Sequence, residues 1–326
     1  MTWLVTGGAG YIGAHVVRAF LADGIDVVVI DDLSSGKAEF VPDGVRFVRS
    51  NLLDGTAVRD ALDGVSGVVH LAGFKYAGVS VDRPMHTYTQ NVTAMVSLLE
   101  AMADKEIRNL VFSSSAGVYG TPEDEIVTEQ TPPDPQSPYG ESKLIGEWLL
   151  RDQARAAELN HTSLRYFNVV GSGDPSVYDA SPYNLFPIVC DLLAQGKTPQ
   201  IYGTDHPTPD GTSVKDYVHV ADLARAHVTA ARSLEAGKTL EPVYNLGSGT
   251  GTSVREIMNA ARRVTGIDFT PGEAPRRPGD PSRVVDAHAA LGDQHAPPRV
   301  ALLGSAHRPM LGPGHTTGAA AAPRDD

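Results

Sequence analysis

The sequence predicts an α/β fold: an open, doubly wound parallel sheet with a second, smaller domain towards the C-terminus. Two observations support this prediction. A short apolar segment at residues 2–6 leads through a glycine-rich turn into an amphipathic helix, and further short apolar runs then alternate with helical patterns. Buried strands that alternate with helices form parallel sheets covered by helices on both faces.

The first strand–turn–helix unit is the clearest part of the pattern. Residues 2–6 favour a strand, and apolar residues at helical spacing predict a helix over about residues 12–22. The β-branched run 27–30 predicts a second buried strand, which ends at Asp31 and Asp32. The order is therefore strand, glycine turn, helix, strand, acid.

Later segments repeat this alternation. We expect strands at residues 45–48, 68–71, 110–112 and 163–166, and helices at 92–104 and 139–157. Ligands of open parallel sheets bind beyond the carboxyl ends of the strands. Ala72, Gly73, Ser113–Ser115 and Asn168 follow such strands, so these residues are expected to line a site.

Composition and charge exclude several classes of protein. The 326 residues are 41% hydrophobic and 20% charged, as in globular proteins, and the formal net charge of −12 disfavours binding to nucleic acid or to an anionic membrane. Cys190 is the single cysteine, so no intrachain disulfide forms, and the eleven histidines show no metal-ligand spacing. The histidine spacing therefore predicts no metal site. No apolar run approaches a transmembrane length and no signal-peptide pattern is visible, so we expect a cytoplasmic protein.

The turn after the first strand has the composition of a phosphate-binding loop. Gly7 and Gly10 allow a tight turn and the close approach of a pyrophosphate, which the positive N-terminus of the next helix attracts, and Gly13 lets helix and sheet pack closely. Asp31 lies eighteen residues after Gly13, where a carboxylate accepts hydrogen bonds from ribose hydroxyls and repels a 2′-phosphate. The pattern predicts bound NAD rather than NADP.

A second motif, Tyr139 and Lys143, has the spacing that places two side chains on one helix face. For Tyr139 to act as a base near neutral pH, its pKa of about 10 must fall by roughly three units, or about 4 kcal/mol. One positive charge about 5 Å away supplies about 3 kcal/mol at an effective dielectric near 20. Lys143 together with an oxidised nicotinamide could therefore activate the phenol, whereas Lys143 alone in bulk water could not.

These motifs together resemble the extended short-chain dehydrogenase/reductase family, and within it the branch that epimerises nucleotide sugars. The resemblance covers about residues 1–286. It rests on residues 6–13, 31–32, 70–75, 91–92, 112–119, 137–143, 164–168, 184–185, 201–205, 210–212, 216–220, 244–247 and 276–280.

The resemblance implies a Rossmann-type fold and reversible C4 epimerisation of a UDP-hexose, UDP-glucose or UDP-galactose, through a 4-keto sugar in galactose metabolism. Tyr139 would take the proton of the 4-hydroxyl, Ser115 would bond the 4-oxygen, and Lys143 would anchor the nicotinamide ribose. The implied cofactor-binding residues are Gly7, Gly10, Tyr11, Ile12, Gly13, Asp31, Asp32, Asn51, Leu52, Leu71, Ala72, Gly73, Lys75, Asn91, Ser113, Tyr139, Lys143 and Tyr166. The implied substrate-binding residues are Lys75, Ser115, Tyr139, Asn168, Asn184, Leu185, Tyr202, Lys215, Arg277 and Asp280.

The resemblance also sets expectations for domains and assembly. Residues 1–168 are expected to form the NAD-binding domain, to which 215–244 returns, and residues 169–214 and 245–290 the UDP-sugar domain. A homodimer is expected through helices 92–104 and 139–157; the candidate surface residues are Leu98, Leu99, Met102, Leu144, Trp148 and Leu149, with burial in the monomer core as the alternative.

Four positions qualify the resemblance. Lys215 stands where the family has arginine, which removes a forked phosphate contact, and Gly117 replaces a threonine. Asn51 stands where an aspartate often contacts adenine, and its carbonyl could still accept that hydrogen bond. Val284, near the pocket for the sugar, is small enough to leave room for an N-acetyl group.

The C-terminal tail departs most strongly. Residues 291–326 are rich in Gly, Ala and Pro and lack the final amphipathic helix of the family. Our hypothesis is that the reading frame has shifted near residue 290, which the coding DNA would test.

Two other functions remain open. Another NAD-dependent nucleotide-sugar epimerase or a decarboxylase is compatible with the motifs, whereas a 4,6-dehydratase would need an acidic pair where Ala116 and Gly117 stand. A non-catalytic nucleotide-binding protein, impaired by its tail, is the alternative of a different class.

Overall fold

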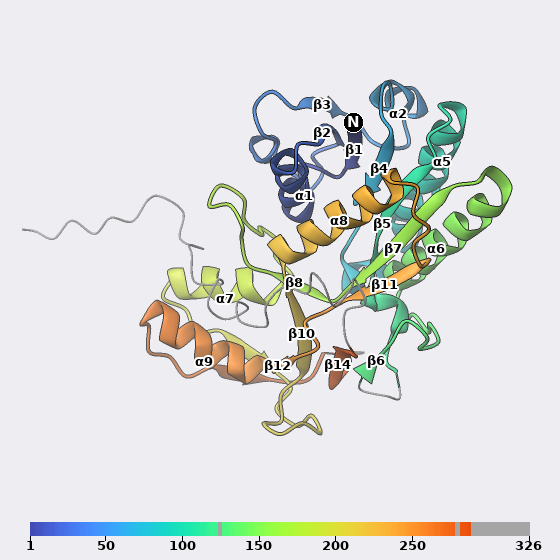
Figure 1. Cartoon of the computed structure of the whole chain (residues 1–326). Coiled ribbons are helices and arrows are strands. Elements are labelled where there is room, and N and C mark those ends of the chain that lie inside the picture. The colour runs from blue at the N-terminus through green and yellow to red at the C-terminus, as the bar shows by residue number, and fades with distance from the viewer. Residues whose placement is uncertain (123–125, 278–280, 288–326) are drawn as a thin grey trace, which may run out of the picture.

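A seven-stranded parallel sheet forms the larger part of the molecule in this computed structural model, which describes residues 1–122, 126–277 and 281–287 (Figure 1). Its strand order is β11-β7-β5-β4-β1-β2-β3, and every neighbouring pair is parallel. The strands are β1 (Thr2–Thr6), β2 (Asp26–Asp31), β3 (Arg46–Arg49), β4 (Gly67–His70), β5 (Asn109–Ser115), β7 (Asn160–Tyr166) and β11 (Val243–Leu246). The predicted fold class is confirmed.

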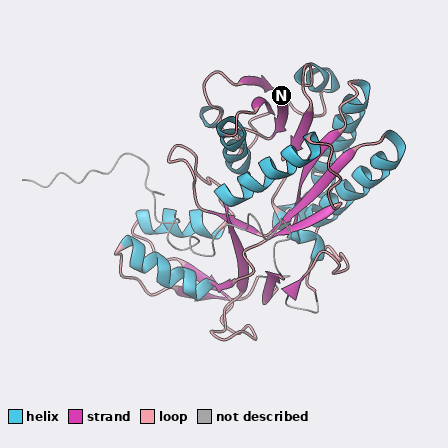
Figure 2. Ribbon diagram, in the orientation of Figure 1, coloured by secondary structure: helices cyan, strands magenta, loops and turns pink. Residues whose placement is uncertain are grey.

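Helices cover both faces of this sheet (Figure 2). Alternate residues of one strand point to opposite faces, so Leu4 packs with α2 and α5, whereas Trp3 and Val5 pack with α1 and α8. The helices of this layer are α1 (Tyr11–Ala22), α2 (Gly55–Ala61), α3 (Ala77–Asp82), α4 (Pro84–Tyr88), α5 (Ala94–Asp104), α6 (Pro138–Ala157) and α8 (Val220–Glu235), with short turns at Ala38–Phe40, Thr89–Thr93 and Ala116–Tyr119. Two buried cores therefore flank the sheet.

A second, smaller sheet lies at the lower part of Figure 1. Its order is β12-β10-β14-β6, with β8 also paired to β10. The strands are β6 (Ile126–Val127), β8 (Asn168–Val170), β10 (Val214–His219), β12 (Gly251–Ser253) and β14 (Arg283–Asp286). The accompanying elements are α7 (Leu185–Ala194), α9 (Val254–Thr265) and the two-stranded pair β9 (Gln200–Tyr202) with β13 (Gly272–Ala274).

The chain crosses between these layers more than once. β10 belongs to the smaller sheet, α8 then packs on the larger sheet, and β11 forms its edge. The division into two domains along residue 168 stays a prediction, and residues 291–326 lie outside the described residues. None of the helices in the described part of the chain is both long and apolar enough to traverse a bilayer.

The residues proposed for an intersubunit surface occupy different environments. Leu98, Leu99, Met102 and Leu144 are buried in this chain, so their assignment to an exposed surface was wrong and the monomer-core alternative holds. Leu149 is partly buried against the core, whereas Trp148 is 47% exposed on α6.

Candidate active site

The glycine loop between β1 and α1 has no room for side chains. Gly7 adopts a φ of 71°, and a Cβ there would lie 2.8 Å from the amide nitrogen of Ala72. A Cβ on Gly13 would lie 2.1 Å from the carbonyl oxygen of Gly7. Within the described chain, no side chain caps α1 at Gly10, so its first N–H groups are available to an anion. This cradle fits the pyrophosphate of a dinucleotide.

Two aspartates, Asp31 and Asp32, lie at the end of β2. The Asp31 carboxylate accepts hydrogen bonds from the backbone N–H groups of Ala9 (3.1 Å) and Leu33 (2.8 Å), and burial raises its pKa. Asp32 accepts from Ser34 N–H at 2.8 Å and from the Asn51 amide at 2.6 Å; these bonds lower its pKa against the opposing effect of burial. The carboxylates are thus placed by the backbone beside the glycine loop.

Asn51 is already engaged on both sides of its amide. Its nitrogen donates to Asp32 and, at 3.0 Å, to Gln90, and its carbonyl accepts from Leu53 N–H at 3.0 Å. The neighbouring Leu52 is buried in the core beneath the sheet. An adenine contact by Asn51 stays a prediction.

The loop after β4 is tied to both β1 and α6. Thr6 Oγ1 accepts from the N–H groups of Leu71 (3.2 Å) and Ala72 (3.1 Å). Asn91 bonds the backbone N–H (2.6 Å) and carbonyl (2.9 Å) of Phe74 and donates to Ser142 Oγ at 2.8 Å. Asn91 therefore clamps this loop to α6.

The Lys75 side chain leaves that loop beside an aromatic ring. Its Nζ lies 5.7 Å from the ring centroid of Tyr76. A Cβ on Gly73, where φ is 151°, would lie 2.8 Å from Asn91 Oδ1. The backbone at Gly73 therefore lies against the Asn91 side chain, with no space for a larger residue.

The expected reacting residues converge between β5 and α6. Ser137 caps α6 by accepting from Gly140 N–H at 3.2 Å, which starts the helix just before Tyr139. Tyr139 is hydrogen-bonded to Ser115, the last residue of β5. Lys143 Nζ donates to the carbonyl of Ser113 at 2.9 Å and lies 5.9 Å from the centroid of the Tyr139 ring. The structure therefore brings together Tyr139 and Lys143, which their spacing paired, and Ser115, which the resemblance added.

Burial dominates the electrostatics of this group. It raises the pKa of Tyr139, although the hydrogen bond from Ser115 opposes the rise, and it lowers the pKa of Lys143 to about 8. His70, whose ring stacks on Phe112, has its pKa lowered to about 3 by burial and by Lys143. The raised pKa keeps the Tyr139 phenol protonated near neutral pH in this structure.

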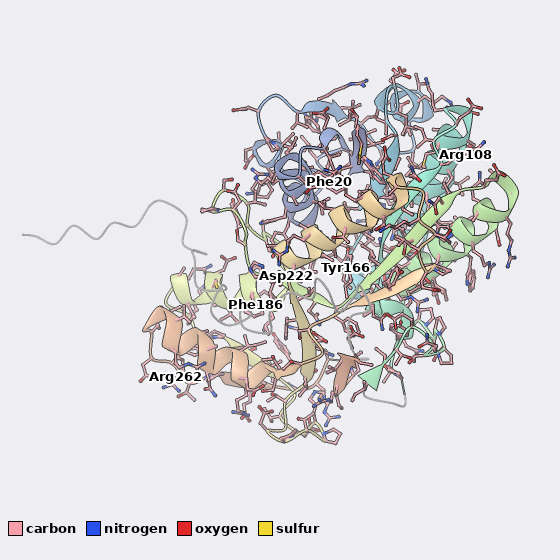
Figure 3. All side chains as sticks on the ribbon, viewed as in Figure 1. Phe20, Arg108, Tyr166, Phe186, Asp222 and Arg262 are labelled. Carbon is pink, nitrogen blue, oxygen red and sulfur yellow. The ribbon has the colours of Figure 1, made fainter. Side chains whose placement is uncertain are left out.

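A histidine that sequence reasoning missed supports this site from α8. His227 Nδ1 lies 2.9 Å from the carbonyl of Leu223, so this nitrogen donates, and Nε2 accepts from Ser113 Oγ at 2.9 Å. Ser113 is also hydrogen-bonded to Tyr166, whose pKa is raised by burial. Figure 3 labels Tyr166 near the middle of the molecule. His227 is 114 residues from Ser113, so no local pattern could have paired them.

Tyr11 and two residues expected to bind the substrate, Asn168 and Asn184, lie near the strands and the helix that follow β7. Tyr11 Oη donates to the carbonyl of Gly171 at 2.5 Å, which ties α1 to the loop after β8, and Ile12 packs beside it. Asn168 donates to the carbonyl of Asp216 at 3.0 Å, and Asn184 precedes Leu185, the first residue of α7. These residues are positioned by β8, β10 and α7.

A cationic group marks the far end of this region. The Arg277 guanidinium lies 4.2 Å from the ring centroid of Tyr202, which is 40% exposed. Lys215 Nζ donates to the carbonyl of Pro281 at 2.9 Å, and Val284 pairs with Lys215 across β10 and β14. Asp280 lies outside the described residues.

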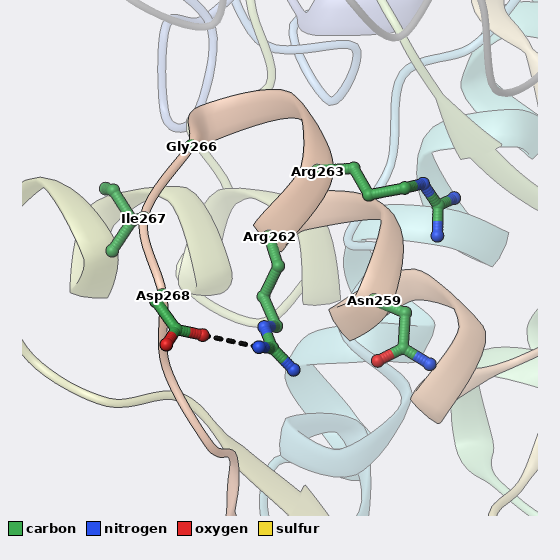
Figure 4. Close-up of a pocket in the computed structure, with 6 residues that line it drawn as sticks. All are labelled: Asn259, Arg262, Arg263, Gly266, Ile267 and Asp268. Carbon is green, nitrogen blue, oxygen red and sulfur yellow. Dashed lines mark hydrogen bonds and ion pairs between the residues drawn. The ribbon is translucent and has the colours of Figure 1, made fainter.

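Two negative observations bound the site. The described residues contain no group of three or more side chains that could hold a metal ion. An open surface pocket of about 400 Å³ lies at the end of α9, lined by Asn259, Arg262, Arg263, Gly266, Ile267 and Asp268 (Figure 4). Arg262 forms an ion pair with Asp268 there, and none of the expected site residues lines it.

Comparisons with known protein sequences identified a family and close relatives. The sequence profile of the NAD dependent epimerase/dehydratase family matches residues 3–247. The UDP-glucose 4-epimerase of Lacticaseibacillus casei is 42% identical over 291 residues, which covers 87% of this chain and 88% of the relative.

Solved structures of UDP-glucose 4-epimerases also have a similar fold. UDP-glucose 4-epimerase from Brucella ovis in complex with NAD superposes with a TM-score of 0.83 at 37% identity, covering 87% of this chain and 89% of that one. The enzyme from Bifidobacterium longum in complex with NAD⁺ and UDP has a TM-score of 0.83 at 31% identity, covering 94% and 97%.

Proposed function

Because this chain belongs to the NAD dependent epimerase/dehydratase family, we propose that it is a UDP-glucose 4-epimerase that interconverts UDP-glucose and UDP-galactose with tightly bound NAD. The observation that carries the proposal is the convergence of Ser115, Tyr139 and Lys143 at the end of β5. The substrate is inferred from the names of the relatives. The choice of NAD is supported by the glycine loop, which has room for a pyrophosphate, and by the position of Asp31 beside it.

In the proposed mechanism, three residues of this chain have separate roles at the sugar and the cofactor. Tyr139 Oη removes the proton of the 4-hydroxyl and returns it after the 4-keto sugar has turned over in the site. Ser115 Oγ holds the 4-oxygen, and Lys143 Nζ, fixed by Ser113, anchors the nicotinamide ribose and supplies positive charge near the phenol. When bound, NAD would supply the reversible hydride chemistry at C4.

Electrostatics keep the proton transfer reversible. Burial raises the pKa of Tyr139, so its phenolate needs positive charge nearby, which an oxidised nicotinamide would add to that of Lys143. A reduced nicotinamide would lack this charge, and Tyr139 would then hold its proton more tightly. Proton transfer at Tyr139 would therefore depend on the redox state of the cofactor in both directions.

Turnover of UDP-galactose tests the proposal. Purified protein, without added NAD, should convert UDP-galactose to UDP-glucose, and Tyr139→Phe should lose at least about 100-fold in kcat while it retains NAD. No UDP-glucose from the unsubstituted protein would overturn the proposal. An unchanged rate in Tyr139→Phe would remove this residue from the mechanism.

The choice of sugar is a second part of the proposal. Val284 is buried with Val118 and Phe167 beside the strand of Lys215, and a side chain as small as valine near the sugar would leave room for a larger substituent. We expect turnover of UDP-N-acetylgalactosamine as well as UDP-galactose; no detectable N-acetyl activity would contradict this expectation.

We also propose a cytoplasmic homodimer that contacts its partner through α5 and α6. Trp148 on α6 and Val96 on α5 are large apolar side chains exposed on these helices. Trp148→Glu should shift the sedimentation coefficient from dimer to monomer, and an unchanged value would exclude this surface.

A further inference from the structure

A buried ion pair lies directly behind the reacting residues. Glu147 is on α6, four residues after Lys143 and eight after Tyr139, so the three side chains follow one face of the helix. Its partner Arg165 is on β7, next to Tyr166. Glu147 is 7% exposed and Arg165 4%, and neither belongs to the expected binding residues.

The pair is fully hydrogen-bonded. Arg165 Nε donates to Glu147 Oε1 at 2.9 Å and Arg165 Nη2 donates to Oε2 at 2.6 Å, which is a forked contact. Ser114 Oγ also donates to Glu147 Oε1, at 2.5 Å. The remaining guanidinium nitrogen, Nη1, donates to Tyr119 Oη at 2.9 Å. Against the opposing effect of burial, the bonds to Glu147 raise the pKa of Arg165, so its charge is permanent.

The contacts of Ser114 connect this pair to the chemistry. Ser114 lies between Ser113, whose carbonyl holds Lys143, and Ser115, which bonds Tyr139. The forked contact therefore fixes α6 to β5 and β7 at the level of the two strand ends that carry the site. A slip of α6 by one residue moves every side chain by about 1.5 Å along the helix axis, which a forked contact does not tolerate.

Stability alone does not account for this arrangement. Desolvation offsets most of the Coulomb attraction of a buried ion pair, and apolar residues of similar volume often replace such pairs without loss of stability. We propose that Glu147 and Arg165 are positioning residues that set the register of α6, and with it the positions of Tyr139 and Lys143, against β5; the proposal rests on the proposed epimerase function.

The same bonds extend towards the smaller sheet. Tyr119 Oη donates to Asn245 Oδ1 at 2.7 Å, and Asn245 Nδ2 donates to Asp286 Oδ1 at 3.3 Å. Asp286 is in β14, which pairs with β10 beside Lys215. A chain of hydrogen bonds therefore connects α6 to the smaller sheet, which carries residues expected to bind the substrate.

An apolar replacement of the pair separates positioning from stability. The double variant Glu147→Met with Arg165→Met leaves no unpaired buried charge, so it is expected to fold with a melting temperature close to that of the unsubstituted protein and to retain NAD. Its kcat for UDP-galactose should fall about tenfold or more, because the reacting residues lose their register, while KM changes less than about twofold. A double variant with unchanged kcat would overturn the proposal.

Two further variants keep the test decisive. Arg165→Lys retains the charge but not the fork, and a fall in kcat at normal NAD content would support positioning even where the double variant fails to fold; an unchanged kcat would contradict it. Arg59→Met with Asp104→Met, which removes an exposed ion pair with Nη2–Oδ2 of 2.7 Å between α2 and α5, is the matched control and should turn over normally.

A readout without turnover separates this proposal from the proposed function. In protein labelled with ¹³C-tyrosine, the signal that disappears in Tyr139→Phe reports the surroundings of that ring. This signal should shift in the double methionine variant and not in the control. Inactive unsubstituted protein would refute the epimerase proposal, whereas an unshifted signal would refute the positioning role.

Discussion

Lys143 is the residue at which the requirements of chemistry and stability conflict. Its ammonium group is buried beside Ser113 and the Tyr139 ring, where its positive charge would assist proton removal in the proposed mechanism. The same burial lowers its pKa from 10.5 to about 8, which means that folding penalises the charged form. Replacing this residue should therefore change activity and stability in opposite directions.

We predict that Lys143→Met is inactive but more stable than the unsubstituted protein at pH 7, by about 3 kcal/mol. The folded pKa lies below the unfolded one, so the unfolded chain binds more protons between pH 8 and 10.5 and the unsubstituted protein gains stability as pH rises through this window. Urea unfolding at increasing pH should show the two proteins converging. A difference in unfolding free energy that is independent of pH would contradict this prediction.

At the scale of elements, the β1–α1 unit depends on one close backbone contact. Gly13→Ala places a methyl group 2.1 Å from the carbonyl of Gly7, which forces α1 away from β1. We expect loss of about 1–3 kcal/mol of stability and loss of NAD from the purified protein, measured by unfolding and by absorbance of the released cofactor. Gly78→Ala, where a Cβ meets nothing within 4 Å, is the control and should behave as the unsubstituted protein.

Elements with local patterns were predictable, and elements that depend on distant partners were not. Residues 2–6 and 139–157 carry their own periodicity, and β1 and α6 formed there within one residue. β10 and β14 are short strands that pair across about seventy residues of sequence. The local sequence pattern therefore did not predict their pairing. Glu147 continues the four-residue spacing of Tyr139 and Lys143, a signal that could have identified it.

One buried carboxylate on β10 adds side-chain hydrogen bonds to the backbone pairing of this strand. Asp216 is fully buried and accepts four hydrogen bonds: from Ser248 N–H and Oγ, both 2.7 Å, from Gly249 N–H at 3.0 Å, and from Asp286 N–H at 3.2 Å. An amide would direct N–H groups at these donors, so Asp216→Asn should lose about 2–3 kcal/mol of stability. Asp152→Asn, at an exposed surface ion pair, should change it by less than about 0.5 kcal/mol, and equal losses in urea unfolding would show that the four bonds contribute little.

For the whole molecule, the buried bases around the larger sheet shift stability with pH in one direction. Lys143, His70 and His227 lie within the layer formed by β4, β5, α6 and α8, and burial lowers the pKa of each. A lowered pKa means that protonation favours the unfolded chain. The protein should therefore lose stability progressively as the solution becomes more acidic, starting well above the range in which carboxylates titrate.

The two histidines place this loss of stability between pH 6.5 and about 3. In the unfolded chain both titrate near 6.5, whereas in the folded protein the pKa is about 3 for His70 and about 4 for His227, so the contribution of these two histidines to stability is complete above pH 6.5 and falls below it. Each histidine should contribute a slope of about 1.4 kcal/mol per pH unit. His227→Gln keeps an acceptor for Ser113 and should remove one of the two slopes, measured by urea unfolding from pH 7 to 5. Parallel curves for the two proteins would show that His227 is protonated in the folded state, which would contradict the hydrogen-bond arrangement from Ser113 through His227 to Leu223.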